Sequence, residues 1–178
     1  MENKTIASTI IKKTPLNCFD IISRATDLYA DRSSFAYFYG AKGQVLTRKL
    51  MDSLVLAESA YFAKYTKDEM RNIYSYSIGR IGIDCSGLIN LLTGRVNWSS
   101  GYWQESVNKT DPISGTWGNI LYTTFGGTGR HIGIDIGQGR FLHAPSEMHS
   151  IEMGYIRDYP WEGSGQLAGV SYFLTGDK

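Results

Sequence analysis

The spacing of apolar residues changes once along this chain, from a helical period to a period of two. Up to about residue 93, apolar residues recur every three or four positions, as they do on the buried face of a helix. Beyond about residue 118 they alternate: Ile132, Ile134 and Ile136 are separated by single residues, which is typical of a half-buried strand. Helices followed by antiparallel strands predict an α+β fold and not an alternating α/β fold.

Local signals give approximate bounds for four helices and four strands. The first helix is expected from Thr14-Pro15 to about Ala30 and the second from Thr47 through Tyr61. The third is expected to start at a capping box formed by Thr66 and Glu69. The fourth is expected over Cys85 to Thr93, with Asp84 as its N-cap and Gly94 as its C-terminal stop. The first helix is expected to bury one face made of Leu16, Phe19, Ile22, Ala25 and Tyr29. The strands are expected at 118–124, 131–136, 141–144 and from Val170 to Leu174.

A single domain is expected over residues 1–178, because 178 residues with 42% hydrophobic content can form one core of ordinary size. Within it, residues 1–13 are interpreted as a flexible arm and residues 41–83 as a helical insertion. Two cysteines do not make a disulfide framework.

Net charge and hydropathy limit the classes of partner that the sequence predicts. Eighteen Lys and Arg against seventeen Asp and Glu give a net charge of +1, which predicts neither a nucleic-acid nor a membrane-surface partner. No apolar run approaches the roughly 20 residues of a membrane span, and residues 1–13 lack the apolar stretch of a signal peptide. A cytoplasmic protein, a phage-delivered protein and a secreted protein with its leader trimmed all remain open; the oligomeric state is not predicted.

Cys85 is the first candidate for chemistry, because a short apolar run meets the start of a helix there. The first turn of a helix has unpaired N–H groups and the positive end of the dipole, so the thiolate should be favoured and the thiol pKa lowered. The alternative is a buried structural thiol, which is the preferred interpretation of Cys18 on the apolar face of the first helix.

Two of the three histidines fall in one expected β-hairpin, at His131 and His143. A three-residue loop, Gly137-Gln138-Gly139, would pair Ile136 with Arg140 and Gly133 with His143, which puts both imidazoles on one face of the sheet. A two-residue loop would separate them. Cys85 with His131 as base and His143 as the partner of its far nitrogen would form a papain-like site. Zinc held by Cys85, His131 and His143 is the alternative, less favoured because no Cys-x-x-Cys or His-Glu-x-x-His motif is present.

At these residues the sequence resembles the NlpC/P60 family of papain-like cysteine peptidases, which cleave bacterial peptidoglycan. Three motifs carry the resemblance: Asp84-Cys85-Ser86-Gly87-Leu88, His131-Ile132-Gly133-Ile134, and Gly139-Arg140-Phe141-Leu142-His143-Ala144. The resemblance implies helices packed on an antiparallel sheet, Cys85 as nucleophile, His131 as base and His143 as the third polar residue. It implies no metal and no cofactor.

The family also has a Tyr-x-Trp-Gly element whose Tyr lies beside the substrate, and Tyr37-Phe38-Tyr39-Gly40 looks like its counterpart, with Tyr39 in place of Trp. Tyr37 is then the implied site tyrosine; Tyr74 or Tyr76, nearer to Cys85 in sequence, are alternatives. Asp84 and Ser86 are implied to bind the amino end of a stem peptide, or Asp84 is only a helix cap. Arg130, Trp98 and Trp103 are further candidates for lining the groove.

The implied activity is an endopeptidase acting between γ-D-glutamyl and a diamino acid in peptidoglycan stem peptides. A related thiol amidase or acyltransferase, and a non-catalytic phage or cell-wall structural module, remain as alternatives. Intact Cys85, His131 and His143 argue against the non-catalytic module.

Overall fold

The computed structural model describes residues 16–127 and 129–172. Its helices are α1 (Cys18–Ala30), α2 (Arg48–Ala57), α3 (Ser59–Phe62), α4 (Lys67–Ser77), α5 (Cys85–Thr93) and α6 (Ser99–Glu105), with short 3-10 turns η2 (Arg32–Ser34), η3 (Pro112–Ser114) and η4 (Ile156–Asp158). Its strands are β1 (Leu16–Asn17), β2 (Phe35–Tyr37), β3 (Lys42–Val45), β4 (Ile81–Ile83), β5 (Val107–Thr110), β6 (Ile120–Thr123), β7 (His131–Gly137), β8 (Arg140–His143), β9 (Glu152–Tyr155), β10 (Gly163–Gln166) and β11 (Val170–Ser171). In this part of the chain, no helix has the length and apolar character needed to cross a membrane.

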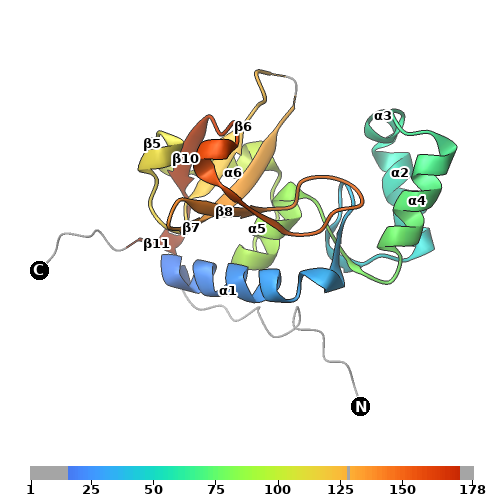
Figure 1. Cartoon of the computed structure of the whole chain (residues 1–178), viewed down its shortest axis with the longest axis horizontal. Helices are drawn as coiled ribbons and strands as arrows, with labels where there is room; N and C mark the ends of the chain where they lie inside the picture. Colours follow the sequence, from blue (N-terminus) through green and yellow to red (C-terminus); the bar gives the residue numbers. More distant parts are fainter. Residues whose placement is uncertain (1–15, 128, 173–178) are drawn as a thin grey trace, which may run out of the picture.

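A six-stranded antiparallel sheet in the order β5-β10-β6-β7-β8-β9 forms the main layer (Figure 1). Helices α1 and α5 pack on it, and one core joins Leu28 of α1 and Leu88 of α5 to Ile132 and Ile134 of β7. Ile132 and Ile134 are fully buried. The predicted order of helices first and antiparallel strands second therefore matches the main architecture.

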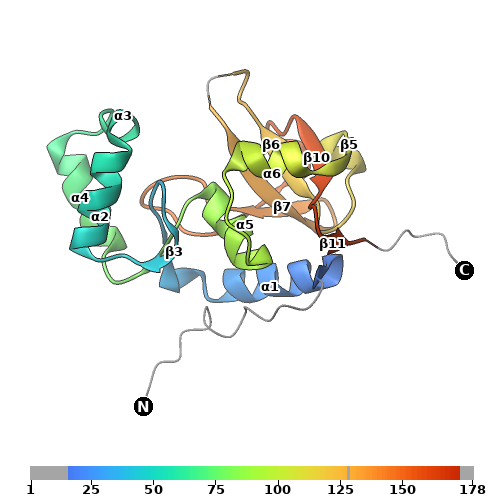
Figure 2. The ribbon, with the colours of Figure 1, turned by 180° about the vertical axis from the view of Figure 1, so that it is seen from behind.

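A second, three-stranded sheet in the order β2-β4-β3 lies between α5 and the segment that contains α2, α3 and α4. The three helices stand apart from the main sheet as a separate lobe (Figures 1 and 2), with their own core around Phe38, Met51, Phe62 and Ile73. Residues 41–83 therefore hold three helices and the two strands β3 and β4, and not the two helices expected.

The parallel pairing of β2 with β4 brings the two ends of this segment together. Tyr37 on β2 pairs with Ile83 on β4, two residues before Cys85. The backbone N–H of Asp84 donates to the carbonyl of Ala41, which closes the junction. A tyrosine 48 positions away in sequence therefore lies beside the start of α5.

The start of α1 differs from the expectation. Thr14 and Pro15 lie outside the described residues; Leu16–Asn17 form β1, parallel to β11, and Asn17 caps α1 through a capping box with Asp20. The buried face is Cys18, Ile21, Ala25 and Leu28, whereas Phe19 is exposed. The prediction was wrong at Phe19, whereas Ala25 is buried and Leu16 and Tyr29 are partly buried against the same core.

The hairpin of β7 and β8 also differs, although its consequence for the histidines holds. The turn is the two residues Gln138-Gly139, both with positive φ, and Gly137 rather than Ile136 pairs with Arg140. The register shifts between Asp135 and Gly137, so β7 carries one extra residue in a bulge. Because Ile134 pairs with Leu142 beyond the bulge, Gly133 stands opposite His143, and both imidazoles lie on one face.

Candidate active site

Cys85 is the first residue of α5, and its position is fixed by the residue before it. The side chain of Asp84 caps the helix by accepting from the backbone N–H of Gly87 at 2.6 Å, and Gly94 ends it in the left-handed conformation, as predicted. The thiol is buried, with 7% of the residue exposed, and it lines a cleft of about 920 Å³.

The cleft lies between the helical lobe and the main sheet, so its walls come from segments far apart in sequence. The residues that line it are Tyr37, Tyr39, Glu58, Tyr61, Lys64, Asp84, Cys85, Ser86, Trp98, Ser99, Ser100, Phe125, Gly127, Gly129, Arg130, His131, Pro145 and Tyr159. Cys85, His131, Tyr37, Asp84 and Ser86, singled out from the sequence, therefore share one cavity; His143 lies behind His131.

Burial, and not the helix terminus, dominates the electrostatics of the thiol. Desolvation, with a smaller contribution from the Asp84 carboxylate, raises the pKa of Cys85 to about 12. The ammonium of Lys42 and backbone groups at Ile132 and Ser86 act in the opposite direction. The lowered pKa expected from the helix N-terminus is therefore not found in the unliganded structure, where Cys85 is a neutral thiol.

His131 and His143 form a direct pair. Nε2 of His131 lies 2.8 Å from Nδ1 of His143, a hydrogen bond between two buried rings. Burial lowers the pKa of His131 to about 3, with His143 adding to the effect, and burial lowers the pKa of His143 to about 4. Both rings are therefore neutral near pH 7, and Nδ1 of His131 is the nitrogen left for another partner.

Aromatic side chains surround the imidazole pair and cause its burial. Trp161 stacks on His131 with ring centroids 5.6 Å apart, and Tyr159 and Phe141 meet His143 edge-on at 5.0 and 4.9 Å. Gly133 makes room for this arrangement, because a Cβ there would approach the Trp161 ring to 3.0 Å. Tyr159 and Trp161 were not predicted from the sequence, because their signal is an aromatic pair around Pro160, which no local pattern connects to the hairpin.

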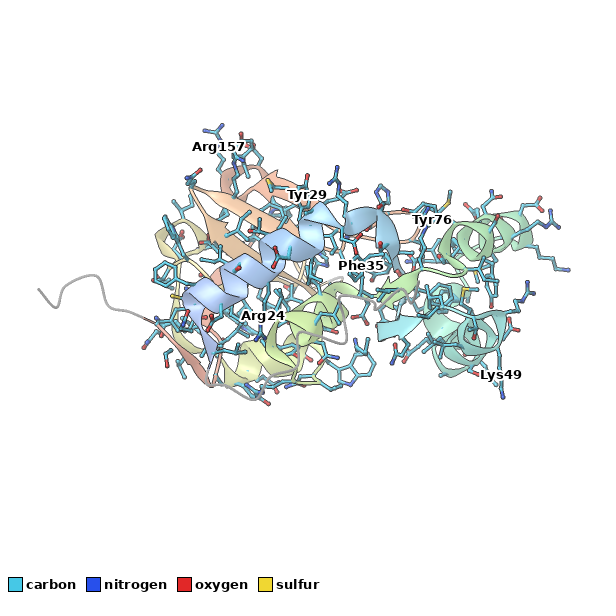
Figure 3. The ribbon with its side chains drawn as sticks, turned by 90° about the horizontal axis from the view of Figure 1, so that it is seen from below. Arg24, Tyr29, Phe35, Lys49, Tyr76 and Arg157 are labelled. Atoms are coloured by element: carbon cyan, nitrogen blue, oxygen red, sulfur yellow. The ribbon has the colours of Figure 1, made fainter. Side chains whose placement is uncertain are left out.

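Tyr37 lies at the cleft beside Cys85, whereas the two alternative tyrosines do not line it. Burial raises the pKa of Tyr37 well above its ordinary value, and Cys85 is the next largest cause. Tyr74 donates to Asp52 at 2.8 Å within the lobe. The Arg80 guanidinium lies over the ring of Tyr76 (labelled in Figure 3), 4.1 Å from its centroid. Position therefore favours Tyr37 as the site tyrosine.

Asp84 and Ser86 form a cluster with Lys42, a residue that was not predicted from the sequence. The Lys42 ammonium donates to Asp84 Oδ1 and Oδ2 at 2.7 and 2.5 Å and to Ser86 Oγ at 2.6 Å. It also lies over the Trp98 ring, 4.4 Å from its centroid. No motif marks Lys42, because its partners are about 40 residues away.

Of the three further groove candidates, two line the cleft and one does not. Trp98 and Arg130 line the cleft, but Trp103 stacks on Tyr122 at 5.0 Å and is no part of its lining. Cys18 is buried in the α1 face. His149 is half exposed and pairs with Glu152 at 2.6 Å.

The zinc alternative finds no support in this geometry. Nε2 of His131 and Nδ1 of His143 face each other at hydrogen-bond distance, which leaves no space for an ion between them. Within residues 16–127 and 129–172, no group of three His, Cys, Asp or Glu side chains is placed to hold a metal.

Comparison with known families places the chain. The model of the NlpC/P60 family matches residues 71–166, more than half of the sequence and the stretch that contains Cys85, His131 and His143. The chain belongs to the NlpC/P60 family. No curated protein sequence gives a match.

Solved NlpC/P60 structures share its fold. The NlpC/p60 domain of the peptidoglycan hydrolase SagA is 21% identical with a TM-score of 0.52, over 85% of this chain and 100% of that one. The peptidoglycan hydrolase RipB from Mycobacterium tuberculosis is 14% identical with a TM-score of 0.52, over 93% and 72% of the two chains. NlpC2 from Trichomonas vaginalis is 14% identical with a TM-score of 0.51, over 83% of this chain and 47% of that one. The predicted α+β, papain-like fold class is confirmed.

The buried imidazole pair predicts a pH dependence of stability. The folded-state pKa values of His131 and His143, about 3 and about 4, lie below the ordinary value of 6.5. At pH values between the folded-state and the ordinary pKa, the unfolded chain therefore binds more protons than the folded chain. The free energy of unfolding should therefore fall as pH drops below about 6.5, by up to about 1.4 kcal/mol per pH unit for each ring. Urea midpoints measured from pH 7 to 4 should show a shallower slope in the H131Q/H143Q variant. Imidazole NMR signals of either ring titrating above pH 6 would contradict the burial argument.

Proposed function

We propose that this chain is a cysteine hydrolase of the bacterial cell wall that cleaves peptidoglycan stem peptides between γ-D-glutamyl and a diamino acid. The observation that carries the proposal is the pairing of His131 Nε2 with His143 Nδ1 behind a cleft lined by both His131 and Cys85. Family membership supports the substrate class, and the peptidoglycan hydrolases SagA and RipB share the fold.

The first half of the reaction acylates Cys85. His131 acts as the base in the tautomer whose Nε2–H donates to Nδ1 of His143, 2.8 Å away, because the lone pair of its Nδ1 can then accept the thiol proton. The sulfur attacks the γ-glutamyl carbonyl carbon, forming a C–S bond and an oxyanion. The C–N bond then breaks, and the leaving amine takes the proton from His131. In the second half, His131 deprotonates water, which attacks the thioester; the acid leaves and the thiol regains the proton.

The start of α5 provides hydrogen-bond donors for the oxyanion. The N–H of Gly87 is taken by the Asp84 side chain, and the N–H of Leu88 by the Asp84 carbonyl. The N–H groups of Cys85 and Ser86 precede the first intrahelical bond and remain for the reacting atoms. Ser86 already acts on the sulfur, since its backbone lowers the thiol pKa.

The cleft also suits the remainder of a stem peptide. Tyr37, Asp84 and Ser86 line it next to Cys85 and are the proposed substrate-binding residues. Lys64 and Arg130 add positive charge to its walls, which complements the carboxylates of a glutamyl and a diamino acid residue.

The direct experiment is digestion of purified muropeptides with product analysis by mass spectrometry. The native chain should release fragments cut after the γ-D-glutamyl carbonyl, and Cys85→Ala should abolish release while the thermal melting curve is unchanged, because only the nucleophile is lost. Cys18→Ala is the matched control and should retain the same products. Cleavage that survives Cys85→Ala would refute the mechanism, and products cut at the muramyl–alanine bond would assign an amidase.

The two histidines should differ in their effect. His131→Ala removes the proton acceptor, whereas His143→Ala leaves a misaligned one, so His131→Ala should lower kcat/KM more. Initial rates on one muropeptide decide this. Equal losses, or a larger loss for His143→Ala, would mean that the two roles are assigned to the wrong rings.

Tyr37→Phe should weaken turnover with little loss of stability. Removing one hydroxyl that forms a typical hydrogen bond costs about 0.5–1.5 kcal/mol, roughly two- to twelvefold in kcat/KM. Tyr74→Phe is the control, since its hydroxyl bonds to Asp52 inside the lobe. A lower kcat/KM for Tyr74→Phe, with no change for Tyr37→Phe, would assign the role of site tyrosine to Tyr74.

A further inference from the structure

The ammonium of Lys42 lies among side chains that line the cleft beside the nucleophile. Lys42 comes from β3 and is not itself a lining residue, but its Nζ contacts Asp84, Ser86 and Trp98, which all line the cleft. Only 11% of its side chain is exposed. The contact is therefore a buried ion pair at the cleft floor and not a solvated surface pair.

Asp84 has no acceptor capacity to spare. Its Oδ1 accepts from the Gly87 N–H, the Ser86 hydroxyl and Lys42, at 2.6, 2.9 and 2.7 Å. Its Oδ2 accepts from the Gly40 N–H and Lys42, at 3.1 and 2.5 Å. Five hydrogen bonds from four groups fill the lone-pair sites of this carboxylate, which number about four.

The side chains of Ser86 and Trp98 also contact the Lys42 ammonium. The Ser86 hydroxyl donates to Asp84 and accepts from Lys42, and the Trp98 ring faces the same ammonium at 4.4 Å. An acid, a hydroxyl and an aromatic face are the groups that recognise an ammonium. In this chain the ammonium that Asp84, Ser86 and Trp98 contact is that of Lys42.

We propose that Lys42 is a specificity-determining residue, which makes the cleft select stem peptides whose amino end is acylated and neutral over those with a free ammonium. This inference rests on the proposed function and narrows its substrate class. A second ammonium at the cleft floor would meet Lys42 at close range, where like charges repel, and would find no free acceptor. An amide at that position carries no charge to repel. The favoured substrate is a stem still joined to its glycan by an amide, and not a released peptide.

The test compares one stem tetrapeptide in two forms, with a free amino end and with an acetylated one. The native chain should favour the acetylated form in kcat/KM by on the order of tenfold. Lys42→Met should reverse this preference, because Asp84 and Ser86 are then released to accept from the free ammonium. Lys42→Arg should preserve the native preference, and Lys49→Met, which removes an equal charge on α2 in the lobe (Figure 3), should leave it unchanged.

A purely structural role for Lys42 would lower both rates together and leave the ratio unaltered, which would overturn the inference. A native preference for the free amine would also overturn it. Because Lys42→Met leaves a buried carboxylate without its cation, the double variant Lys42→Met/Asp84→Asn provides a neutral pair. It should lose the native discrimination without gaining affinity for the amine; retained discrimination would contradict the proposal.

A binding measurement separates this inference from the proposed function. In the Cys85→Ala background, calorimetry with L-alanyl-γ-D-glutamate and its N-acetyl form should show tighter binding of the acetylated ligand, reversed by Lys42→Met. If the native chain cleaves no stem peptide while this reversal is seen, the proposed function fails and the role of Lys42 stands. If cleavage is seen without reversal, the proposed function stands and the role of Lys42 is refuted.

Discussion

The carboxylate of Asp84 connects the parts of the molecule that make up the site. It caps α5 at Gly87, holds the turn after β2 through the N–H of Gly40, and pairs with the ammonium of Lys42 on β3. Since Cys85 follows Asp84 directly, these contacts determine where the sulfur lies. Since Tyr37 lies on β2, the same contacts place the tyrosine beside it. Removing one partner of such a buried pair leaves an uncompensated charge, so the cluster holds together as a unit.

Burial determines the charge state of the reacting groups. Cys85 sits below the cleft surface with a raised pKa, and His131 and His143 lie inside an aromatic cage with lowered pKa values. The unliganded protein therefore holds a neutral thiol beside neutral imidazoles. When the thiol proton moves to His131, the negative charge on the sulfur forms where backbone N–H groups and Lys42 can stabilise it. The thiolate therefore forms during the reaction and not before it.

Local signals in the sequence predicted the local structure well. The caps at Thr47, Thr66 and Asp84 and the stop at Gly94 are in the predicted places, because each depends on a few neighbouring residues. The first helix ends at Ala30 as predicted, but its start was misplaced because Leu16–Asn17 pair with β11, which lies at the other end of the chain. The strands β5, β9 and β10 and the helix α6 were not predicted. Their sequences alternate weakly, and they form through pairing with distant partners.

The candidate site shows the same division. Cys85, His131 and His143 could be identified from motifs, and the shared face of the two rings follows from strand parity, although a bulge and not a three-residue loop provides it. Lys42, Tyr159 and Trp161 could not be found, because nothing near them in sequence indicates their partners. The direction of the thiol pKa was wrong since burial, which outweighs the helix terminus, is a property of the assembled fold.

In the proposed reaction, Cys85 attacks the γ-glutamyl carbonyl with His131 as its base. The measurement that tests it most directly is covalent labelling by an N-acetyl-L-alanyl-γ-D-glutamyl chloromethyl ketone, with the modified residue identified by tandem mass spectrometry. We expect one label on Cys85, none on Cys18, and much slower labelling in His131→Ala. A label on another residue, or labelling of Cys85 at the same rate without His131, would contradict it.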